Sequence, residues 1–265
     1  GNNDSSSSNN NSKGGRKRSL HTSLQIGGPE GPQFTYDAVH PSGDGQADLY
    51  GDTVRPLVRQ CLKGYNATVL AYGQTGSGKT YTILGPGGGV GAGVGCVDDA
   101  PSSATSAASI RGEESAGVIP RALRELFETL QHRTLNPGPA PSGTRTTFRY
   151  EIRLQFLELY GEEVRDLLST SPTTAGGLKI RDNGGATGSE PDVVGASEIT
   201  VRNADEALLC LARGMLRRVT GATAMNAESS RSHAIMTAVI EQTSSTFLDD
   251  AENDDDDDDD DDGEI

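Results

Sequence analysis

The sequence predicts an α/β fold in which helices flank a central, mainly parallel sheet. Three observations lead to this prediction. Segments with strand periodicity alternate with segments of helix periodicity between about residues 34 and 242. A glycine-rich turn follows a short apolar run and leads directly into a helix-compatible segment. Low-complexity stretches occupy the two ends and a few internal breaks, which leaves patterned sequence sufficient for one domain.

The first predicted elements surround the glycine-rich turn. Val69 to Tyr72 is a short apolar run of strand type, and Lys79 to Leu84 is compatible with a helix that Gly85-Pro86 stops. A longer amphipathic helix follows Pro120, a residue that a first helical turn tolerates. Its apolar positions have i, i+3, i+4, i+7 spacing and are Leu123, Leu126, Phe127 and Leu130.

Residues 148–156 alternate between apolar and polar, which predicts a strand with one buried face. A turn at Gly161 then leads into a predicted short helix, Glu162 to Leu168. The apolar members of the strand are Phe148, Tyr150, Ile152, Leu154 and Phe156.

The last predicted pair is a helix followed by a strand. Asn203, with Glu206 three residues later, makes a capping-box-like helix start. Ala234 to Ile240 is a nearly continuous apolar run, which is typical of a strand covered on both faces. The apolar positions of the helix are Leu208, Leu211 and Met215.

Composition sets the expected domain boundaries. Apolar residues make up 33% of the 265 residues, there is no Trp, and 34 Gly accompany runs of Ser, Asn and Asp. Such runs bury too little surface to fold. We therefore expect a disordered N-terminal segment, residues 1–32, and a folded region, residues 33–243, with a low-complexity insertion at residues 85–116. Residues 244–265 are expected to form a disordered acidic tail.

Charge and cysteine content narrow the function classes. Of the formal net charge of −15, most lies in the tail, where 13 acidic residues leave 25 acidic against 23 basic residues elsewhere. A nearly neutral body shows no direct nucleic-acid site. Cys61, Cys96 and Cys210 lack metal-ligand spacing and are interpreted as reduced thiols of an intracellular protein. No apolar run is long enough to span a membrane, so we expect no membrane partner.

A phosphate-binding pattern, G-x-x-x-x-G-K-[ST], lies between the first predicted strand and helix. Its glycines let successive amide groups point at phosphate oxygens. Lys79 is expected to bridge the β- and γ-phosphates, and Thr80 to place its hydroxyl on Mg²⁺. A chance match in a Gly-rich turn is the alternative. Tyr81 either stacks on a base or ribose or packs on the sheet. The pattern consists of Gly73, Gln74, Thr75, Gly76, Ser77, Gly78, Lys79 and Thr80.

Four segments resemble the kinesin motor family, and the resemblance covers about residues 34–242. They are GYNATVLAY from Gly64 to Tyr72, GVIPR from Gly117 to Arg121, FLELYGEEVRDLL from Phe156 to Leu168, and TGATAMNAESSRSHAI from Thr220 to Ile235. The last segment is similar to the family's switch I, and its sequence is nearest to that of the chromokinesin-like branch. The resemblance implies a P-loop NTPase fold of the kinesin-motor type.

The resemblance also implies a function. A kinesin motor domain binds ATP with Mg²⁺ and couples its hydrolysis to movement along microtubules, so we expect an ATPase in the cytoplasm on the microtubule cytoskeleton. Ser230 is implied as a second Mg²⁺ ligand, Asn226 and Ser229 as contacts to the γ-phosphate or the attacking water, and Arg231 as a latch to a second switch. His233 closes the segment that senses the γ-phosphate.

The resemblance is incomplete at both ends. No Arg-x-Arg-Pro-type adenine motif precedes Phe34, and no Asp-x-x-Gly-x-Glu switch II follows Thr243. No coiled coil is recognised either. We therefore interpret the chain as a partial motor domain. The alternative function is a nucleotide-binding interaction module without efficient hydrolysis, while an unrelated P-loop kinase or GTPase is disfavoured because residues 226–233 fit neither class.

Overall fold

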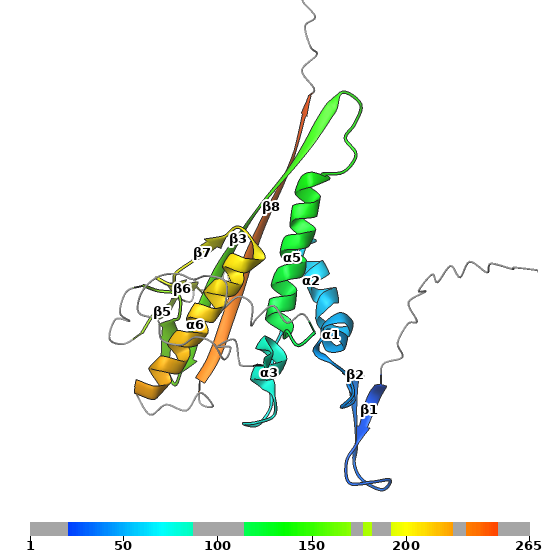
Figure 1. Ribbon diagram of the computed structural model, residues 1–265, viewed down its shortest axis with the longest axis vertical. Helices are drawn as coiled ribbons and strands as arrows, with labels where there is room; N and C mark the ends of the chain where they lie inside the picture. The colour runs from blue at the N-terminus through cyan, green and yellow to red at the C-terminus, as the bar shows by residue number, and fades with distance from the viewer. Residues whose placement is uncertain (1–20, 87–113, 171–176, 182–191, 225–231, 249–265) are drawn as a thin grey trace, which may run out of the picture. The chain divides into compact units, whose positions relative to one another are not determined.

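The computed structural model describes residues 21–86, 114–170, 177–181, 192–224 and 232–248 (Figure 1). The chain divides into two compact units, residues 1–44 and residues 45–265. The second unit contains the predicted phosphate loop and the main sheet.

The first unit contains an antiparallel hairpin of β1 (His21–Gln25) and β2 (Gln33–Val39). The turn between the strands is closed by Gln25, whose side-chain amide donates to the Pro29 carbonyl at 2.6 Å. A strand at β1 shows that the prediction of disorder for residues 1–32 is wrong for this part of the segment. Composition did not indicate β1, because its pairing partner β2 lies outside the low-complexity stretch.

The second unit opens with consecutive helical segments, α1 (Gln46–Leu49), the π-helical η1 (Tyr50–Val54) and α2 (Arg55–Cys61). Pro56 lies in the first turn of α2, directly after the π-helical segment η1. This region contributes four buried residues to the core, Tyr50, Val54, Val58 and Leu62.

The segment before the phosphate loop differs from its prediction. Val69 to Tyr72 is assigned no strand, and its side chains are exposed, with Leu70 at 84% and Tyr72 at 95%. A strand gains its backbone hydrogen bonds only from a neighbouring strand, and no described strand pairs with this run. An apolar run by itself therefore did not suffice to make a strand.

Both helices predicted around the insertion are present. α3 (Lys79–Leu84) ends at Gly85, whose φ of +99° favours glycine. α5 (Val118–Leu135) begins after Gly117, with Pro120 in its first turn. The apolar face predicted for α5 is buried, since Leu123, Leu126, Phe127 and Leu130 are all at most 6% exposed.

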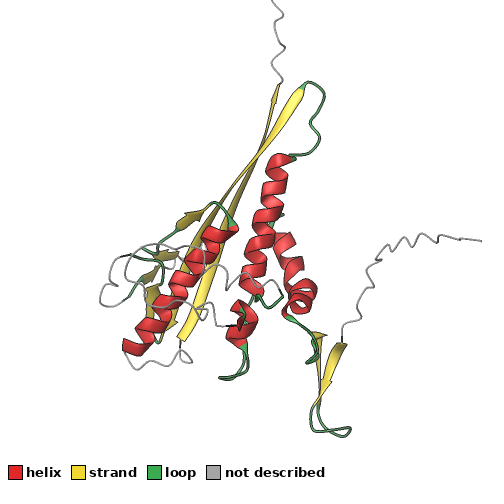
Figure 2. Ribbon diagram, in the orientation of Figure 1, coloured by secondary structure: helices red, strands yellow, loops and turns green. Residues whose placement is uncertain are grey.

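Two long strands form the centre of the main sheet. β3 (Thr144–Tyr160) and β8 (Ser232–Leu248) pair antiparallel from Thr144↔Leu248 to Tyr160↔Ser232 (Figures 1 and 2). β8 passes residue 243, so the expected boundary of the acidic tail at residue 244 is wrong for Ser244 to Leu248. Pairing with β3 holds this polar end of the strand in place.

The other edge of β3 pairs with two short strands. β7 (Ile199–Val201) pairs at Ile152 to Leu154, and β4 (Glu163–Asp166) pairs at Leu157 to Tyr160. A separate antiparallel pair joins β5 (Lys179–Arg181) to β6 (Asp192–Val194). Every pairing among the described strands is antiparallel, which corrects the expectation of a mainly parallel sheet for this part of the chain.

β4 replaces the short helix predicted from Glu162 to Leu168. Tyr160 and Glu163 are paired, so Gly161 and Glu162 form a two-residue hairpin loop. Such loops need a positive φ at their first position, and Gly161 has a φ of +60°. The turn chemistry therefore outweighed the helical propensity of the acidic and leucine residues that follow.

α6 (Ala204–Ala224) begins at the predicted cap. The Asn203 side chain accepts the Glu206 amide N–H at 2.8 Å. The Glu206 carboxylate accepts the Arg202 amide at 2.8 Å, one residue before the position that a capping box uses. Two amide groups at the helix start are thereby satisfied.

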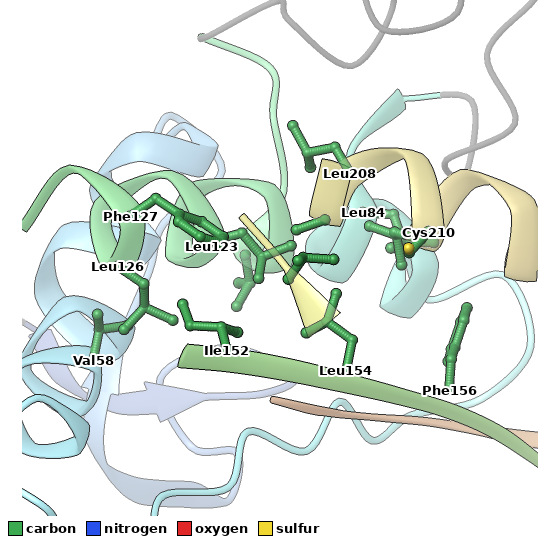
Figure 3. Close-up of a cluster of buried hydrophobic side chains, with 14 of the residues drawn as sticks. Val58, Leu84, Leu123, Leu126, Phe127, Ile152, Leu154, Phe156, Leu208 and Cys210 are labelled. Carbon is green, nitrogen blue, oxygen red and sulfur yellow. The ribbon is translucent and has the colours of Figure 1, made fainter. Parts of the chain in front are cut away.

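One core lies between the sheet and the helices α5 and α6 (Figure 3). Ile152, Leu154 and Phe156 point from one face of β3 toward Leu123 and Phe127 of α5 and toward Leu208 of α6. Ile152 and Leu154 have no exposed surface. The strand prediction for residues 148–156 and the helix prediction after Asn203 are confirmed by this packing.

Candidate phosphate-binding site

The loop from Gly73 to Thr80 curls tightly before α3. Gly76 and Gly78 have φ angles of +81° and +91°, a region that other residues rarely adopt. Ser77 donates its amide to the Gln74 carbonyl at 3.2 Å, which closes the turn. The predicted glycines thus allow a tight backbone turn before α3.

Lys79 lies across this loop. Its ammonium donates to the carbonyl oxygens of Gly73 and Gln74, at 2.8 Å each. The positive charge is therefore held beside the loop's backbone. A phosphate oxygen is a stronger acceptor than a carbonyl, so an entering phosphate can replace either bond.

The two sides of the loop are in close contact at Gly73. A Cβ atom at this position would lie 2.5 Å from the Ser77 hydroxyl oxygen, and the φ of Gly73 is +155°. A side chain here would force the Ser77 hydroxyl to move and would strain the backbone at this φ. Glycine at the first position of the pattern avoids both effects.

α3 is fixed from the side by Gln46, a residue that the sequence prediction missed. The Gln46 side chain is 8% exposed, and its amide donates to the Tyr81 carbonyl at 2.6 Å. Leu84, also 8% exposed, joins the core at the end of the helix. No local pattern marks Gln46, because its partner lies 35 residues away in the sequence.

α3 also meets the start of α5 without space for a side chain. A Cβ atom on Gly117 would lie 2.6 Å from the Gly85 nitrogen and 2.6 Å from the Leu84 carbonyl carbon. The low-complexity insertion therefore leaves and re-enters the fold at one point. It lengthens the chain here without separating the loop's helix from the core.

The two residues after Lys79 face solvent in part. Thr80 is exposed, as the predicted Mg²⁺ ligand must be to reach an ion, and Tyr81 is 54% exposed. This exposure argues against close packing of Tyr81 on the sheet. Contact with a base or ribose stays a prediction.

The predicted switch residues Asn226, Ser229, Ser230 and Arg231 lie outside the described residues. The next described residue is Ser232, the first residue of β8, and His233 after it is exposed. The roles predicted for the four switch residues therefore stay predictions.

The described residues contain no group of three or more His, Cys, Asp or Glu side chains placed to hold a metal ion. None of the described helices has the length and apolar character to cross a membrane.

The loop sequence and the sheet flanked by helices agree with a P-loop NTPase fold. The family model of the kinesin motor domain matches residues 2–253. The chain belongs to the kinesin motor domain family, as the four sequence segments predicted. Family members bind nucleotide, generally with Mg²⁺.

Individual kinesins are similar to most of the chain. Mouse chromosome-associated kinesin KIF4 is 36% identical over 209 residues, which are 79% of this chain and 14% of that protein. Dictyostelium discoideum kinesin-related protein 8 is 37% identical over 82% of this chain and 10% of that protein. Human kinesin-like protein KIF21A is 38% identical over 79% of this chain and 11% of that protein. The chain thus spans about a tenth to a seventh of these relatives.

Solved structures agree with this assignment. A fast kinesin, whose structure was interpreted for its ATPase mechanism and its interactions with microtubules, superposes with a TM-score of 0.64 at 28% identity, over 85% of this chain and 55% of the other. Chromosome-associated kinesins are among the relatives, which agrees with the resemblance of the predicted switch I sequence to the chromokinesin-like branch. Because other kinesins match at similar identity, the comparisons assign the family and not the branch.

Proposed function

We propose that the chain is the nucleotide-binding part of a microtubule motor, in which ATP hydrolysis with Mg²⁺ is coupled to movement along microtubules. The location proposed is the microtubule cytoskeleton of the cytoplasm. One observation carries the proposal: the ammonium of Lys79 is held at 2.8 Å from two carbonyls of a loop whose glycines have positive φ, in a chain of the kinesin motor family.

The residues present fit a nucleotide with its ion. The Gly73 to Thr80 loop supplies backbone amides for the phosphates, and Lys79 supplies a movable positive charge. Thr80 and Ser230 are the proposed Mg²⁺ ligands, and Tyr81 is the proposed contact to the base or ribose. A bound Mg²⁺ would neutralise phosphate charge as it develops during transfer.

The switch residues complete the proposal. Asn226 and Ser229 would contact the γ-phosphate or the attacking water, and Arg231 would pair with an acidic group of a second switch. Small amide and hydroxyl side chains suit this task because they donate hydrogen bonds without occupying the space that water needs. These roles rest on the family's motif at the same positions.

Replacing Lys79 tests the proposal. Lys79→Ala is expected to weaken the equilibrium binding of Mg-ATP by about 10-fold or more, since hydrogen bonds to charged groups contribute about 1.5–3 kcal/mol each. Fluorescent nucleotide titration of the full chain measures this. Lys63→Ala, which removes an exposed lysine outside the loop, is the matched control and should bind like the wild type.

Thr80→Ala sharpens the same experiment. Titration of Mg²⁺ at fixed ATP should show a weaker dependence of binding on the ion, because one proposed ligand is lost. Equal nucleotide affinity of Lys79→Ala and the wild type would overturn the proposed site. So would a wild-type chain that binds no nucleotide while it remains folded.

A further inference from the structure

The helix that carries Lys79 is too short to hold its own position. α3 has six residues, fewer than two turns, and helices of this length are not stable in isolation. Its C-terminal end is fixed by the buried side chain of Leu84 and by the close approach of Gly85 to Gly117. Lys79 and Thr80 lie at the opposite end, so their placement depends on contacts nearer to the start of the helix.

Gln46 makes such a contact. Its side-chain amide donates to the Tyr81 carbonyl at 2.6 Å, one residue after Thr80. Gln46 is 8% exposed, so water competes little for this bond. The same carbonyl also accepts the Gly85 amide at 2.8 Å, which closes the last turn of α3. Gln46 thus binds the helix from outside without replacing a helical hydrogen bond.

The segment that carries Gln46 is itself anchored. Gln46 is the first residue of α1, and the start of α1 is capped by the Gly45 amide, which donates to the Asp48 carboxylate at 3.0 Å. One helical turn later, the Tyr50 hydroxyl donates to the Glu125 carboxylate of α5 at 2.9 Å, and Tyr50 is 2% exposed. Burial and this hydrogen bond raise the pKa of the Tyr50 hydroxyl, so it keeps its proton at neutral pH. Gln46 therefore reaches α3 from a segment that is fixed on α5.

We propose that Gln46 is a positioning residue for the nucleotide phosphates, because it holds α3 at the Tyr81 carbonyl and thereby sets the place of the Lys79 ammonium. This inference rests on the proposed function, since it takes Lys79 to bind the phosphates. Hydrogen bonds to a phosphate depend on distance and angle, so a helix that shifts or tilts by a fraction of an ångström weakens them. The role is not local in the sequence, because 35 positions separate Gln46 from Tyr81.

The inference predicts a loss of affinity that ADP and ATP share. Lys79 is expected to contact the β-phosphate, which both nucleotides carry. Removing the Gln46 contact should therefore weaken the binding of Mg-ADP and of a non-hydrolysable Mg-ATP analogue. A merely structural role would lower the melting temperature and leave the nucleotide affinity of the folded protein unchanged.

Gln46→Met is the main variant. Methionine has a similar length and no polar hydrogen, so it fills the site without donating to Tyr81. The Tyr81 carbonyl keeps the Gly85 amide and is not left unpaired. The dissociation constant of a fluorescent ADP analogue is expected to rise by about 3- to 10-fold. Gln60→Met, at an exposed glutamine of α2, is the matched control and should bind like the wild type.

A double-mutant cycle shows whether Gln46 acts through Lys79. If Gln46 places the Lys79 ammonium, its replacement has little left to disturb once that ammonium is absent. Gln46→Met in the Lys79→Ala background should therefore weaken nucleotide binding by less than about 2-fold. Equal factors in the two backgrounds would show that Gln46 does not position Lys79, and would overturn the inference.

Gln46→Asn covers the case in which Gln46→Met does not fold. Asparagine keeps a polar amide at the buried site, but its side chain is one methylene shorter, so the amide no longer reaches the Tyr81 carbonyl. The same rise of the dissociation constant is expected. Far-UV circular dichroism and thermal unfolding establish that each tested protein is folded.

The outcomes separate this inference from the proposed function. A folded wild type that binds no nucleotide removes the proposed function, and the inference with it. A wild type whose affinity falls with Lys79→Ala, together with a folded Gln46→Met or Gln46→Asn protein of wild-type affinity, overturns the positioning role alone. A loss confined to the ATP analogue also overturns it. A loss shared by both nucleotides that shrinks in the Lys79→Ala background supports it.

Discussion

β3 and β8 have the same length and pair with each other along all 17 residues, but they differ in burial. In β3, Ile152 and Leu154 have no exposed surface, whereas Ile235 of β8 is 49% exposed. β3 has β8 on one edge and β7 and β4 on the other, and helices α5 and α6 cover its core face. β8 pairs only with β3 among the described strands.

The difference shows that position in the sheet decides burial more than apolar content does. The run Ala234 to Ile240 is more continuously apolar than the alternating residues of β3, and it was predicted to be covered on both faces. That prediction is wrong for the described residues: Ala234 and Ile235 are exposed, while Met236 and Ile240 are partly buried against the core. The side chains of this run that reach the core, Met236 and Ile240, are only partly buried.

The largest effect on stability is expected when an isoleucine is replaced in each of the two strands. Ile152→Ala should lower the free energy of unfolding by about 2–5 kcal/mol, because it leaves a cavity in the core. Ile235→Ala should cost less than about 1 kcal/mol, the range of strand propensity at a half-exposed site. Urea unfolding followed by circular dichroism measures both. Similar losses for the two variants would show that β8 is covered as fully as β3.

A second test concerns how closely α6 approaches β3. A Cβ atom at Gly214 would lie 2.2 Å from Cδ1 of Phe156, a ring that is only 3% exposed. Gly214→Ala is therefore expected to lower the free energy of unfolding by about 1–3 kcal/mol through overpacking. The better helix propensity of alanine offsets up to about 1 kcal/mol of this loss. Thermal unfolding measures the net effect.

A compensating variant decides whether the ring is the cause. Adding Phe156→Leu to Gly214→Ala should recover part of the loss, because the smaller side chain makes room for the new methyl group. A stabilising effect of Gly214→Ala alone would mean that the helix shifts at no cost. The close contact would then have no role in holding α6 on β3.

The smallest expected effect lies on the exposed face of the same two strands. Arg153 of β3 donates to Glu241 of β8 at 2.6 Å, and this hydrogen bond lowers the pKa of the Glu241 carboxyl. A lowered pKa in the folded state contributes stability above the unfolded pKa and loses it as the pH falls through the folded value. The Glu241 side chain is 60% exposed, so the contribution is small.

Glu241→Gln should therefore be slightly less stable than the wild type at pH 7, and the difference should shrink below about pH 4. Melting temperatures between pH 3 and pH 7 measure it, and added salt should reduce it. A difference that grows on acidification would contradict this assignment of the Arg153 partner.

Local patterns predicted the elements whose cause is local. The spacing of Leu123, Leu126, Phe127 and Leu130 fixed the buried face of α5, and Asn203 with Glu206 marked the start of α6. The glycine turn before α3 was predicted because Gly73, Gly76 and Gly78 lie within a few residues of each other and need particular backbone angles, while phosphate binding by this turn stays a prediction. Helix caps, periodicity and tight turns involve residues within a few positions of each other.

What depends on distant partners was not predictable in this way. The run before the phosphate loop reads as a strand, and Glu162 to Leu168 reads as a helix, but the first lacks a described neighbour and the second pairs with β3 after the Gly161 turn. β1 was missed for the converse reason, since β2 supplies its hydrogen bonds. A strand exists only together with its partner.

The sequence by itself thus determined the family and the helical periodicity, because both depend on residues that lie near each other in the chain. Only the tertiary structure decided that Gln46 holds the loop's helix, that Gly117 admits α3 against α5, and that Arg218 joins Glu158 to Ser232. These contacts connect residues that are 14 to 60 positions apart. Their energy comes from burial and from hydrogen bonds shielded from water, and both arise only when the chain is folded.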